Sequence, residues 1–502
     1  MSPSAVTSDG HAAIGTNGLK KGHSESKNTP LTWTTFSNVI DGKLETTKET
    51  RCGINPATEQ NNPSVPVASK EDVDRAMIAA QKAFKPWAAV PYAERQKAVL
   101  EFADALEAEK EPFSKFLTQE QGKPIQFARM EIDTAVAWMR ATASLELPVE
   151  KTDAGDKEIV VRYTPLGVAV GLVPWNFPIL LAAGKLAAAV VTGNPIIIKP
   201  SPFTPGGGLK LVELAQRYFP PGVVQVLSGD DNLGIWLTAH PTPAKISFTG
   251  STATGKKVME SASKTLKRVT LELGGKDPAI ICDDVKIDDV AAKIATFAFL
   301  NSGQICLAVK RILVHEKIID EFRNALVKHT KLLKLGEGNK EGVFLGPIQN
   351  SMQFERVKGF FADIEKEGMN VAVGGKNPGG KGYFITPTII DRPAEDSRLV
   401  IEEPFGPIVP LLSFANDEEA ITKANNTFYG LGASVWSGDV DRANRIAQQI
   451  EAGTVWVNTH FEMDPSIPFG GHKQSGIGNE QGMAGLKSYC NSQTLYLRKS
   501  NL

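Results

Sequence analysis

Apolar side chains in the first part of the chain recur at the spacing of an amphipathic helix. This spacing predicts helices over residues 70–84, 92–109 and 111–121. Ser69, followed three residues later by Asp72, matches a capping box and marks the start of the first helix. The sequence therefore predicts a helical segment before residue 122.

From residue 167 the pattern changes to short, almost wholly apolar runs that alternate with helical spacing. Parallel strands that are buried on both faces have such continuous apolar runs. The predicted strands are 167–173, 195–199, 223–227, 245–250 and 268–273, and the predicted helices are 179–191, 208–219 and 254–263. A second stretch of mixed strands and helices follows over 277–473. Strands that alternate with helices predict an α/β fold with a parallel sheet covered by helices.

The apolar segment 167–184 is long enough to be mistaken for a membrane span. Pro174 and Pro178 interrupt it, and a membrane helix tolerates proline only where its neighbours satisfy the freed backbone groups. A strand, a proline-bounded loop and a buried helix explain the same residues. No association with a membrane is therefore expected.

Polar and glycine-rich segments follow the predicted strands. Open α/β sheets bind ligands beyond the carboxyl ends of their strands, and a helix start there offers free N–H groups to a phosphate. The segments are PWNFP (174–178), KPSPFTP (199–205), SGDD (228–231), TGSTATG (249–255) and ELGG (272–275). The G-x-G-x-x-G fingerprint is absent from these turns, so each turn alone is weak evidence. Several such strand ends together predict a nucleotide cofactor.

Composition narrows the class of protein. The chain has 502 residues, so two or three domains are expected, and its net charge of −1 gives no global attraction to nucleic acid. Four cysteines without a C-x-x-C pairing argue against zinc ribbons and disulfide frameworks, and no metal site is predicted.

A reducing compartment is expected, most simply the cytoplasm, although the terminal Ser-Asn-Leu is weakly similar to a peroxisomal address. Residues 1–35 lack the apolar core of a signal peptide and are expected to form a disordered leader.

Cys306, in the run LNSGQICLAVKR, is the cysteine whose role matters most. A lone cysteine is more often a buried core residue than a nucleophile. His460 follows it by 154 positions, which loosely resembles the spacing of a cysteine hydrolase, although the residues around Cys306 do not match that class. The neighbouring sequence of Cys306 does not decide between these readings.

Seven motifs, in this order, decide it. They are PWNFP, IIIKPS, FTGSTATG, LELGG, NSGQIC, EEPFGP and PFGGHKQSG. Together they resemble the aldehyde dehydrogenase superfamily, and the resemblance extends from about residue 36 to residue 495. It implies a variant Rossmann cofactor domain (36–140 and 160–276), a catalytic α/β domain (277–473) and a small oligomerisation hairpin (141–159 and 484–498). Members of this family usually form dimers or tetramers, so a homodimer or homotetramer is expected.

The resemblance also implies catalytic roles. Cys306 matches the nucleophile, Asn176 the side-chain donor of the oxyanion hole, and Glu272 the general base. Lys185 and Glu480 match positions associated with proton relay or support, and a structural ion pair between them is an equal alternative. The implied reaction oxidises an aldehyde to a carboxylic acid with NAD(P)+ through a cysteine thiohemiacetal and thioester. Glu272 favours hydrolysis of the thioester over its transfer to coenzyme A.

The cofactor residues that the resemblance implies come from four of these motifs and the SGDD turn. They are Trp175, Lys199, Ser201, Gly229, Gly250, Ser251, Gly255, Glu403 and Phe405. One position departs from the family pattern, because members that prefer NAD often have glutamate three residues after the lysine, where this chain has Pro202. NAD is expected as the cofactor, and NADP stays possible.

The implied substrate pocket is apolar. Its residues are Phe177, Leu181, Ile305, Leu307, Phe461 and Met463. No arginine in these segments is placed to bind a substrate carboxylate. An apolar or aromatic aldehyde is therefore expected, and a semialdehyde dehydrogenase for an acid-bearing aldehyde is the alternative.

Overall fold

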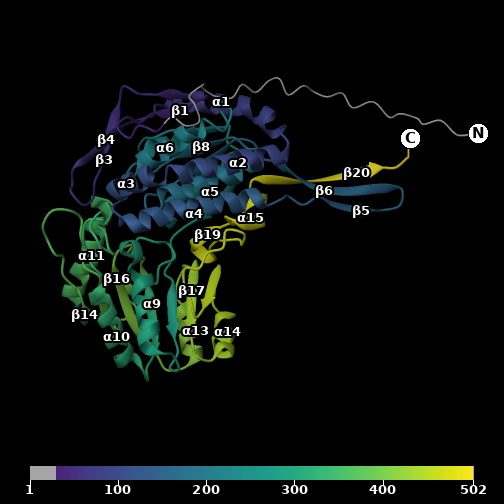
Figure 1. Ribbon diagram of the computed structural model, residues 1–502. Helices are drawn as coiled ribbons and strands as arrows, with labels where there is room; N and C mark the ends of the chain where they lie inside the picture. Colours follow the sequence, from purple (N-terminus) through teal and green to yellow (C-terminus); the bar gives the residue numbers. More distant parts are fainter. Residues whose placement is uncertain (1–29, 501–502) are drawn as a thin grey trace, which may run out of the picture.

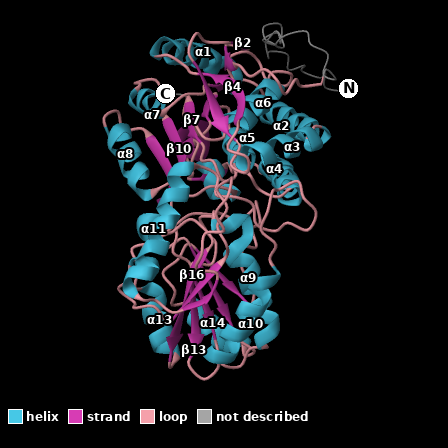
Figure 2. Cartoon of the chain, turned by 90° about the vertical axis from the view of Figure 1, so that its left-hand side faces the viewer, coloured by secondary structure: helices cyan, strands magenta, loops and turns pink. Residues whose placement is uncertain are grey.

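The computed structural model describes residues 30–500, which form two α/β units and a projecting arm (Figure 1). Figure 2 shows the two units one above the other. Residues 1–29 of the expected leader lie outside this range. Residues 30–35 do not behave as a leader, because Leu31 is buried in the core and the Trp33 ring packs edge-on against Phe113 at 4.8 Å. The folded part thus begins several residues before the predicted boundary at residue 36.

The first unit is built on an eight-stranded sheet. Its order is β19 (Gly476–Ile477), β11 (Arg268–Glu272), β10 (Lys245–Thr249), β7 (Ala169–Leu172), β8 (Ile196–Lys199), β9 (Val224–Val226), β1 (Asn38–Ile40) and β2 (Lys43–Glu45). The five strands from β11 to β9 are parallel, as the alternating pattern predicts. The chain runs outward from β7 to β9 on one side and resumes at β10 on the other. This reversal between β7 and β10 is a topological switch point, where open sheets bind ligands.

Helices cover both faces of this sheet. They are α1 (Lys70–Ala88), α2 (Tyr92–Ala108), α3 (Lys110–Gln121), α4 (Ile125–Ser144), α5 (Pro178–Val191), α6 (Pro205–Ala215), α7 (Asp231–Ala239) and α8 (Thr252–Ser263). The predicted capping box is present, since Ser69 and Asp72 each accept from the other's backbone. Helix α6 begins and ends earlier than predicted. Its early start is explained by Pro205 at its first position and by the buried Glu120 carboxylate, which accepts from its first N–H groups.

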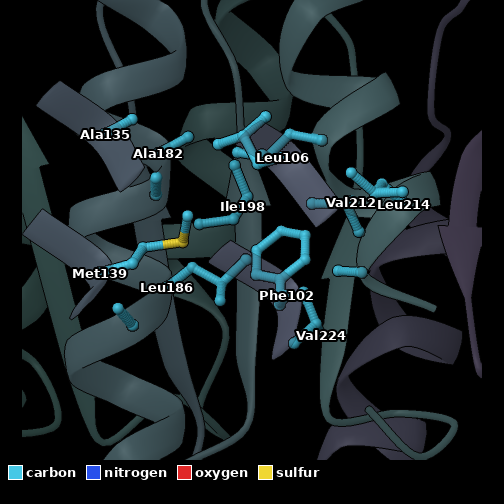
Figure 3. Close-up of a cluster of buried hydrophobic side chains, with 14 of the residues drawn as sticks. Phe102, Leu106, Ala135, Met139, Ala182, Leu186, Ile198, Val212, Leu214 and Val224 are labelled. Atoms are coloured by element: carbon cyan, nitrogen blue, oxygen red, sulfur yellow. The ribbon is translucent and has the colours of Figure 1, made fainter. Parts of the chain in front are cut away.

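A continuous apolar core lies between α2, α4, α5, α6 and the sheet (Figure 3). The Phe102 side chain of α2 is fully buried at its centre and packs edge-on against Phe219 at 5.7 Å. Helix α5 is buried on most of its surface because α4 covers the side that faces away from the sheet. This explains why its sequence is apolar almost throughout.

The second unit has a seven-stranded sheet. Its order is β14 (Val371–Val373), β15 (Thr388–Asp391), β16 (Ile408–Phe414), β13 (Arg311–His315), β12 (Pro278–Ile281), β17 (Gly432–Trp436) and β18 (Thr454–Val457). Its helices are α9 (Ile287–Phe299), α10 (Ile319–Leu332), α11 (Ser351–Glu367), α12 (Arg398–Ile401), α13 (Asp417–Asn425) and α14 (Val440–Ala447), with the short turns η1 (Leu300–Gly303) and η2 (Lys473–Ser475). All strands but β14 run parallel.

A three-stranded arm projects from the first unit (Figure 1). It consists of β5 (Glu150–Asp153), β6 (Lys157–Pro165) and β20 (Cys490–Arg498), in the order β20-β6-β5. The arm differs in its bounds from the predicted 141–159 and 484–498, since α4 continues to Ser144 and α15 occupies Gly482–Lys487. A separate hairpin pairs β3 (Thr50–Ile54) with β4 (Asn61–Pro66). No described helix has the length and apolar character needed to cross a bilayer.

Candidate active site

A cavity of about 1690 Å³ lies where the two units meet. From the first unit it is lined by the segments after β7, β8, β10 and β11, as the position of the switch point predicts. From the second unit it is lined by segments that precede strands, among them Cys306 before β13 and Glu403 before β16. The carboxyl edge of one sheet therefore faces the amino edge of the other across the cavity.

A tightly constrained turn presents Cys306 to this cavity. Asn301 and Ser302 adopt left-handed conformations, with φ of 52° and 56°. Gly303 has φ of 71°, and a Cβ there would lie 2.3 Å from the Gly406 carbonyl oxygen. The Ser302 hydroxyl donates to the Gly346 carbonyl at 2.7 Å. These contacts explain the sequence NSGQIC, since they fix the backbone just before the nucleophile.

Cys306 and Glu272 lie side by side at the floor of the cavity. Burial and the nearby Glu272 charge hold the pKa of the Cys306 thiol well above its usual range. Burial and the Glu480 charge raise the pKa of Glu272 to about 8, and its interaction with the thiol acts in the opposite direction. Glu272 Oε1 is buried and has no hydrogen-bond partner in the described structure. An unpaired carboxylate oxygen beside a thiol suits a general base that works at neutral to mildly alkaline pH.

Asn176 reaches the same floor from the loop between β7 and α5. Its side-chain Nδ2 donates to the Gln304 carbonyl at 3.0 Å, so the amide is held two residues from Cys306. An asparagine amide has two N–H donors. The bond to Gln304 fixes the group and leaves the second donor for an oxygen in the cavity.

Lys185 and Glu480 form an ion pair behind Glu272. Lys185 Nζ bonds to Glu480 Oε1 and donates to the hydroxyls of Ser247 at 3.0 Å and Thr249 at 2.8 Å. The Lys185 side chain is almost fully buried, whereas Glu480 lines the cavity. The expected ion pair between Lys185 and Glu480 is thus present, and the charges of both residues act on the pKa of Glu272.

The other half of the cavity has the chemistry of a nucleotide site. Lys199 ends β8 and is nine-tenths buried, and this burial lowers its pKa to about 8. Ser251 is the N-cap of α8 and accepts from the Thr254 N–H at 3.2 Å, so the first turn of this helix faces the cavity. A cation and a helix N-terminus together suit a phosphate-bearing ligand. Ser201 and Pro202 line the same region.

Asp231 brings a carboxylate into the cavity near Lys199. It begins α7, lines the cavity, and acts on the pKa of Lys199 together with Asp230. The SGDD turn was among the candidate segments, but Asp231 was given no role, and the motif after Lys199 has Pro202 in place of a carboxylate. Asp231 reaches the neighbourhood of Lys199 from a different element.

Glu403 and Phe405 lie between Cys306 and the nucleotide half. Phe405 has φ of 51°, and its ring packs at right angles to that of Trp175, with centroids 5.3 Å apart. Glu403 Oε1 accepts from the Gly275 N–H at 3.3 Å and pairs with Lys310 Nζ at 3.1 Å.

Lys310 is a residue of the site that no motif assigned a role. The same ammonium that pairs with Glu403 donates to the backbone carbonyl of Cys306. Its positive charge partly offsets the rise in the thiol pKa that burial and Glu272 cause. Its position four residues after Cys306 was the only available signal.

Two of the predicted cofactor residues do not line the cavity. Gly229 packs against Leu233, and Gly255 packs against Leu273, which brings α8 close to the end of β11. Gly250 lines the cavity beside Ser251. Gly229 and Gly255 thus pack closely against neighbouring side chains, and their expected contact with the cofactor stays a prediction.

The predicted substrate residues surround the end of the cavity near Cys306. All six line it: Phe177, Leu181, Ile305, Leu307, Phe461 and Met463. The motif-based analysis missed Met130, Thr134 and Trp138 of α4, and Phe469, which line it as well. Among the described lining residues the one arginine is Arg356, which lies beside Glu402 and Glu403 on the cofactor side.

His460 is not placed to act as the base of Cys306, because its ring is held elsewhere. Its Nε2 bonds to the Leu307 carbonyl at 2.8 Å, and its ring packs against Trp456 and Phe297. Burial lowers its pKa to about 4, so it is neutral at physiological pH. The cysteine-hydrolase reading is therefore wrong.

Fold and site together define an α/β oxidoreductase that combines a nucleotide cleft with a cysteine and a carboxyl group at its floor. The model of the aldehyde dehydrogenase family matches residues 44–495. A putative aldehyde dehydrogenase, FUS7, of Gibberella fujikuroi is 42% identical over 93% of this chain and 100% of its own length. The aldehyde dehydrogenase LUC3 of a Fusarium species is 41% identical over 93% of this chain and 100% of its own length.

A solved structure of an aldehyde dehydrogenase has the same fold as this chain. The betaine aldehyde dehydrogenase of Staphylococcus aureus in complex with NAD+ has a TM-score of 0.90 and 32% identity, over 93% of this chain and 96% of that one. The chain belongs to the aldehyde dehydrogenase family. It is an enzyme that oxidises aldehydes with a nicotinamide cofactor.

Proposed function

We propose that the protein oxidises an apolar or aromatic aldehyde to its carboxylic acid through a thiohemiacetal and a thioester on Cys306, followed by hydrolysis. One observation carries this proposal. Cys306 and Glu272 lie together at the floor of a cavity whose other half suits a dinucleotide. A nucleophile and a water-activating base are the two groups that this chemistry requires of a protein.

The residues act in sequence. Cys306 Sγ attacks the aldehyde carbon as a thiolate, and its proton leaves toward the adjacent Glu272 carboxylate. The free N–H of Asn176 donates to the oxygen that gains charge. The cofactor, when bound, supplies the hydride acceptor. After Glu272 has passed on the thiol proton, its carboxylate takes a proton from the water that attacks the thioester. The carbon–sulfur bond then breaks, the carboxylic acid leaves, and Glu272 returns a proton to the sulfur.

Lys185 and Glu480 complete the proton path in this proposal. Glu480 lies near enough to Glu272 to raise its pKa, and Lys185 stabilises Glu480 through the ion pair. A proton taken up by Glu272 can pass to Glu480, which reaches the cavity. The two residues therefore support the base without contacting the substrate.

Lys199, Ser251, Glu403, Phe405 and Trp175 would hold the cofactor. Lys199 suits a ribose of the adenosine half, and the first turn of α8 behind Ser251 suits the pyrophosphate. Glu403 suits the ribose of the nicotinamide half, beside Phe405. NAD is preferred over NADP in this proposal, because the Asp231 carboxylate near Lys199 opposes a 2′-phosphate.

The substrate class follows from the lining of the cavity near Cys306. Its side chains are mainly apolar or aromatic, and the one lining arginine among the described residues is on the cofactor side. An acid-bearing aldehyde lacks a cationic partner there. This favours an apolar or aromatic substrate over a semialdehyde.

The arm is proposed to join subunits into a homodimer or homotetramer. Both edge strands of its sheet, β5 and β20, are almost wholly exposed, and Tyr496 and Leu497 present apolar surface. Exposed strand edges readily pair with another chain.

A reducing compartment such as the cytoplasm suits the protein, since all four cysteines are free thiols and Cys306 must remain one.

The direct test measures reduced-cofactor formation with aliphatic, aromatic and acid-bearing aldehydes, each with NAD+ and with NADP+. The expected result is highest kcat/KM for an apolar or aromatic aldehyde with NAD+, and loss of turnover after alkylation of Cys306. A preference for acid-bearing aldehydes would favour the semialdehyde alternative. Turnover that survives complete alkylation would contradict the mechanism.

A further inference from the structure

Two charged side chains that no motif singled out lie beneath the loop that carries Asn176. Lys123 lies between α3 and α4, and Glu131 lies on α4. Their side chains are fully buried and form an ion pair through Lys123 Nζ and Glu131 Oε2. A buried ion pair persists only where further hydrogen bonds satisfy both partners. The partners of this pair identify what it holds in place.

Lys123 holds the loop at Asn176 itself. Its ammonium donates to the Asn176 backbone carbonyl at 2.8 Å and lies 3.8 Å from the centroid of the Phe177 ring. Both contacts fall between the end of β7 and the start of α5. The Asn176 residue is therefore anchored at its backbone as well as at its side chain.

Glu131 holds the segment that follows. Its Oε1 accepts from the first two available N–H groups of α5, those of Ile179 at 2.9 Å and Leu180 at 3.2 Å. A carboxylate at a helix N-terminus is favourable for the helix dipole. Together the two side chains connect the Asn176 carbonyl to the start of α5 through one rigid bridge.

We propose that Lys123 and Glu131 are positioning residues that set the direction of the Asn176 side-chain donor. The inference rests on the proposed role of Asn176 in the oxyanion hole. Two fixed points orient this residue: its amide on the Gln304 carbonyl and its backbone on Lys123. A displacement of about 1 Å at a reacting group can reduce the rate about a hundredfold.

A purely structural role predicts a different pattern from a positioning role. If the ion pair only stabilises the fold, its removal should lower the melting temperature without changing the rate per folded active site. If the ion pair positions Asn176, its removal should lower kcat per active site, and this loss should depend on Asn176. The two roles therefore separate in a double-mutant cycle.

The first experiment compares Glu131→Gln with a matched control, Glu120→Gln. Glu120 is also a buried carboxylate that caps a helix, since it accepts from the first N–H groups of α6 at 2.7 and 3.1 Å, and among the described residues its carboxylate makes no hydrogen bond to Asn176 or Gln304. Active sites are counted from the alkylated Cys306 peptide. The expected result is a fall in kcat of at least about tenfold for Glu131→Gln, with KM for NAD+ changed less than about twofold, and unchanged kcat for the control.

The second experiment repeats Glu131→Gln in an Asn176→Ala background. There the expected further loss is less than about twofold, because the group that the bridge orients is gone. The rate of Cys306 alkylation by iodoacetamide should be the same in all variants, since that reaction forms no oxyanion. The paired change Lys123→Met with Glu131→Gln removes both buried charges, and it should reproduce the kcat defect if the single variant folds poorly.

Three results would overturn the inference. Wild-type kcat in both Glu131→Gln and the paired variant would refute the bridge alone. An equal loss with and without Asn176 would show that Glu131 acts on catalysis by another route. Wild-type kcat in Asn176→Ala would refute the oxyanion role itself, and with it the function assigned to the bridge.

Discussion

Individual residues at the floor of the cavity were predictable where a motif contains them. Cys306, Glu272 and Asn176 lie in three separate motifs, and the structure brings all three into one cavity. Lys310 and Glu131 were missed, and Asp231 received no role although it lies in the SGDD turn, because the contacts and charges through which each acts depend on the tertiary structure. Sequence patterns thus identify reacting groups better than the charges that tune them.

The raised pKa of Glu272 predicts how activity depends on pH. The value of about 8 means that the carboxyl group is mostly protonated at neutral pH, and a protonated group cannot act as a base. Thioester hydrolysis should rise about tenfold per pH unit below pH 8 and level off above it. The measurement is kcat from about pH 6 to pH 9.5, under conditions where deacylation limits the rate.

Glu480 offers a check on the cause of this shift. Its charge raises the pKa of Glu272, so Glu480→Gln should move the midpoint of the pH profile to lower pH. Loss of the ion pair with Lys185 accompanies this change. A profile that is flat across the range, or a midpoint that moves upward, would contradict the assignment of Glu272.

Asp231 is predicted to set the preference for NAD. Asp231→Ser removes a negative charge near Lys199 and should shift the ratio of kcat/KM for NADP+ over NAD+ upward by about tenfold. The KM for the aldehyde is the internal control and should not change. A ratio that stays the same would show that Asp231 does not face the ribose.

At the scale of elements, periodicity predicted most strands and helices of the first unit but not all their limits. Helix α4 was missed although Ile132, Ala135 and Met139 have helical spacing, and α6 was placed too late because three glycines at its start disfavour a helix. The buried Glu120 carboxylate satisfies the first turn of α6. Tertiary contacts of this kind override local propensity.

Helix α2 gives a prediction about stability. Phe102→Ala would empty space at the centre of the core in Figure 3 and should lower the free energy of unfolding by about 3–5 kcal/mol. Leu100→Ala, on the exposed side of the same helix, is the matched control and should have a much smaller effect. Thermal melting of both variants is the measurement, and equal melting temperatures would contradict this packing role.

Strand β20 gives a prediction about assembly. Changing Tyr496 and Leu497, which are 66% and 46% exposed, to aspartate should reduce the oligomer to smaller species. Leu332→Asp, at an exposed apolar position at the end of α10, should leave the assembly unchanged. Light scattering coupled to size exclusion measures the mass, and an unchanged mass in the β20 variant would place the interface elsewhere.

At the scale of the whole molecule, the site depends on how two sheets face each other. The rule that ligands lie at carboxyl ends of strands correctly pointed to the segments of the first unit. It did not place Cys306 and Glu403, which precede their strands at the amino edge of the second sheet. That arrangement follows from the packing of the two units, which no local pattern encodes.

The proposed mechanism depends on a covalent thioester at Cys306, and Glu272→Gln should allow this intermediate to accumulate. Without this carboxylate, Cys306 should form the thioester more slowly, because the acceptor of its proton is lost, and should release the acyl group far more slowly still, because no base activates the water. The expected result is a burst of one reduced cofactor per active site, followed by a stable mass increase on the Cys306 peptide equal to the acyl group of the aldehyde. Steady turnover at the wild-type rate, or a burst without an adduct on Cys306, would rule out this intermediate.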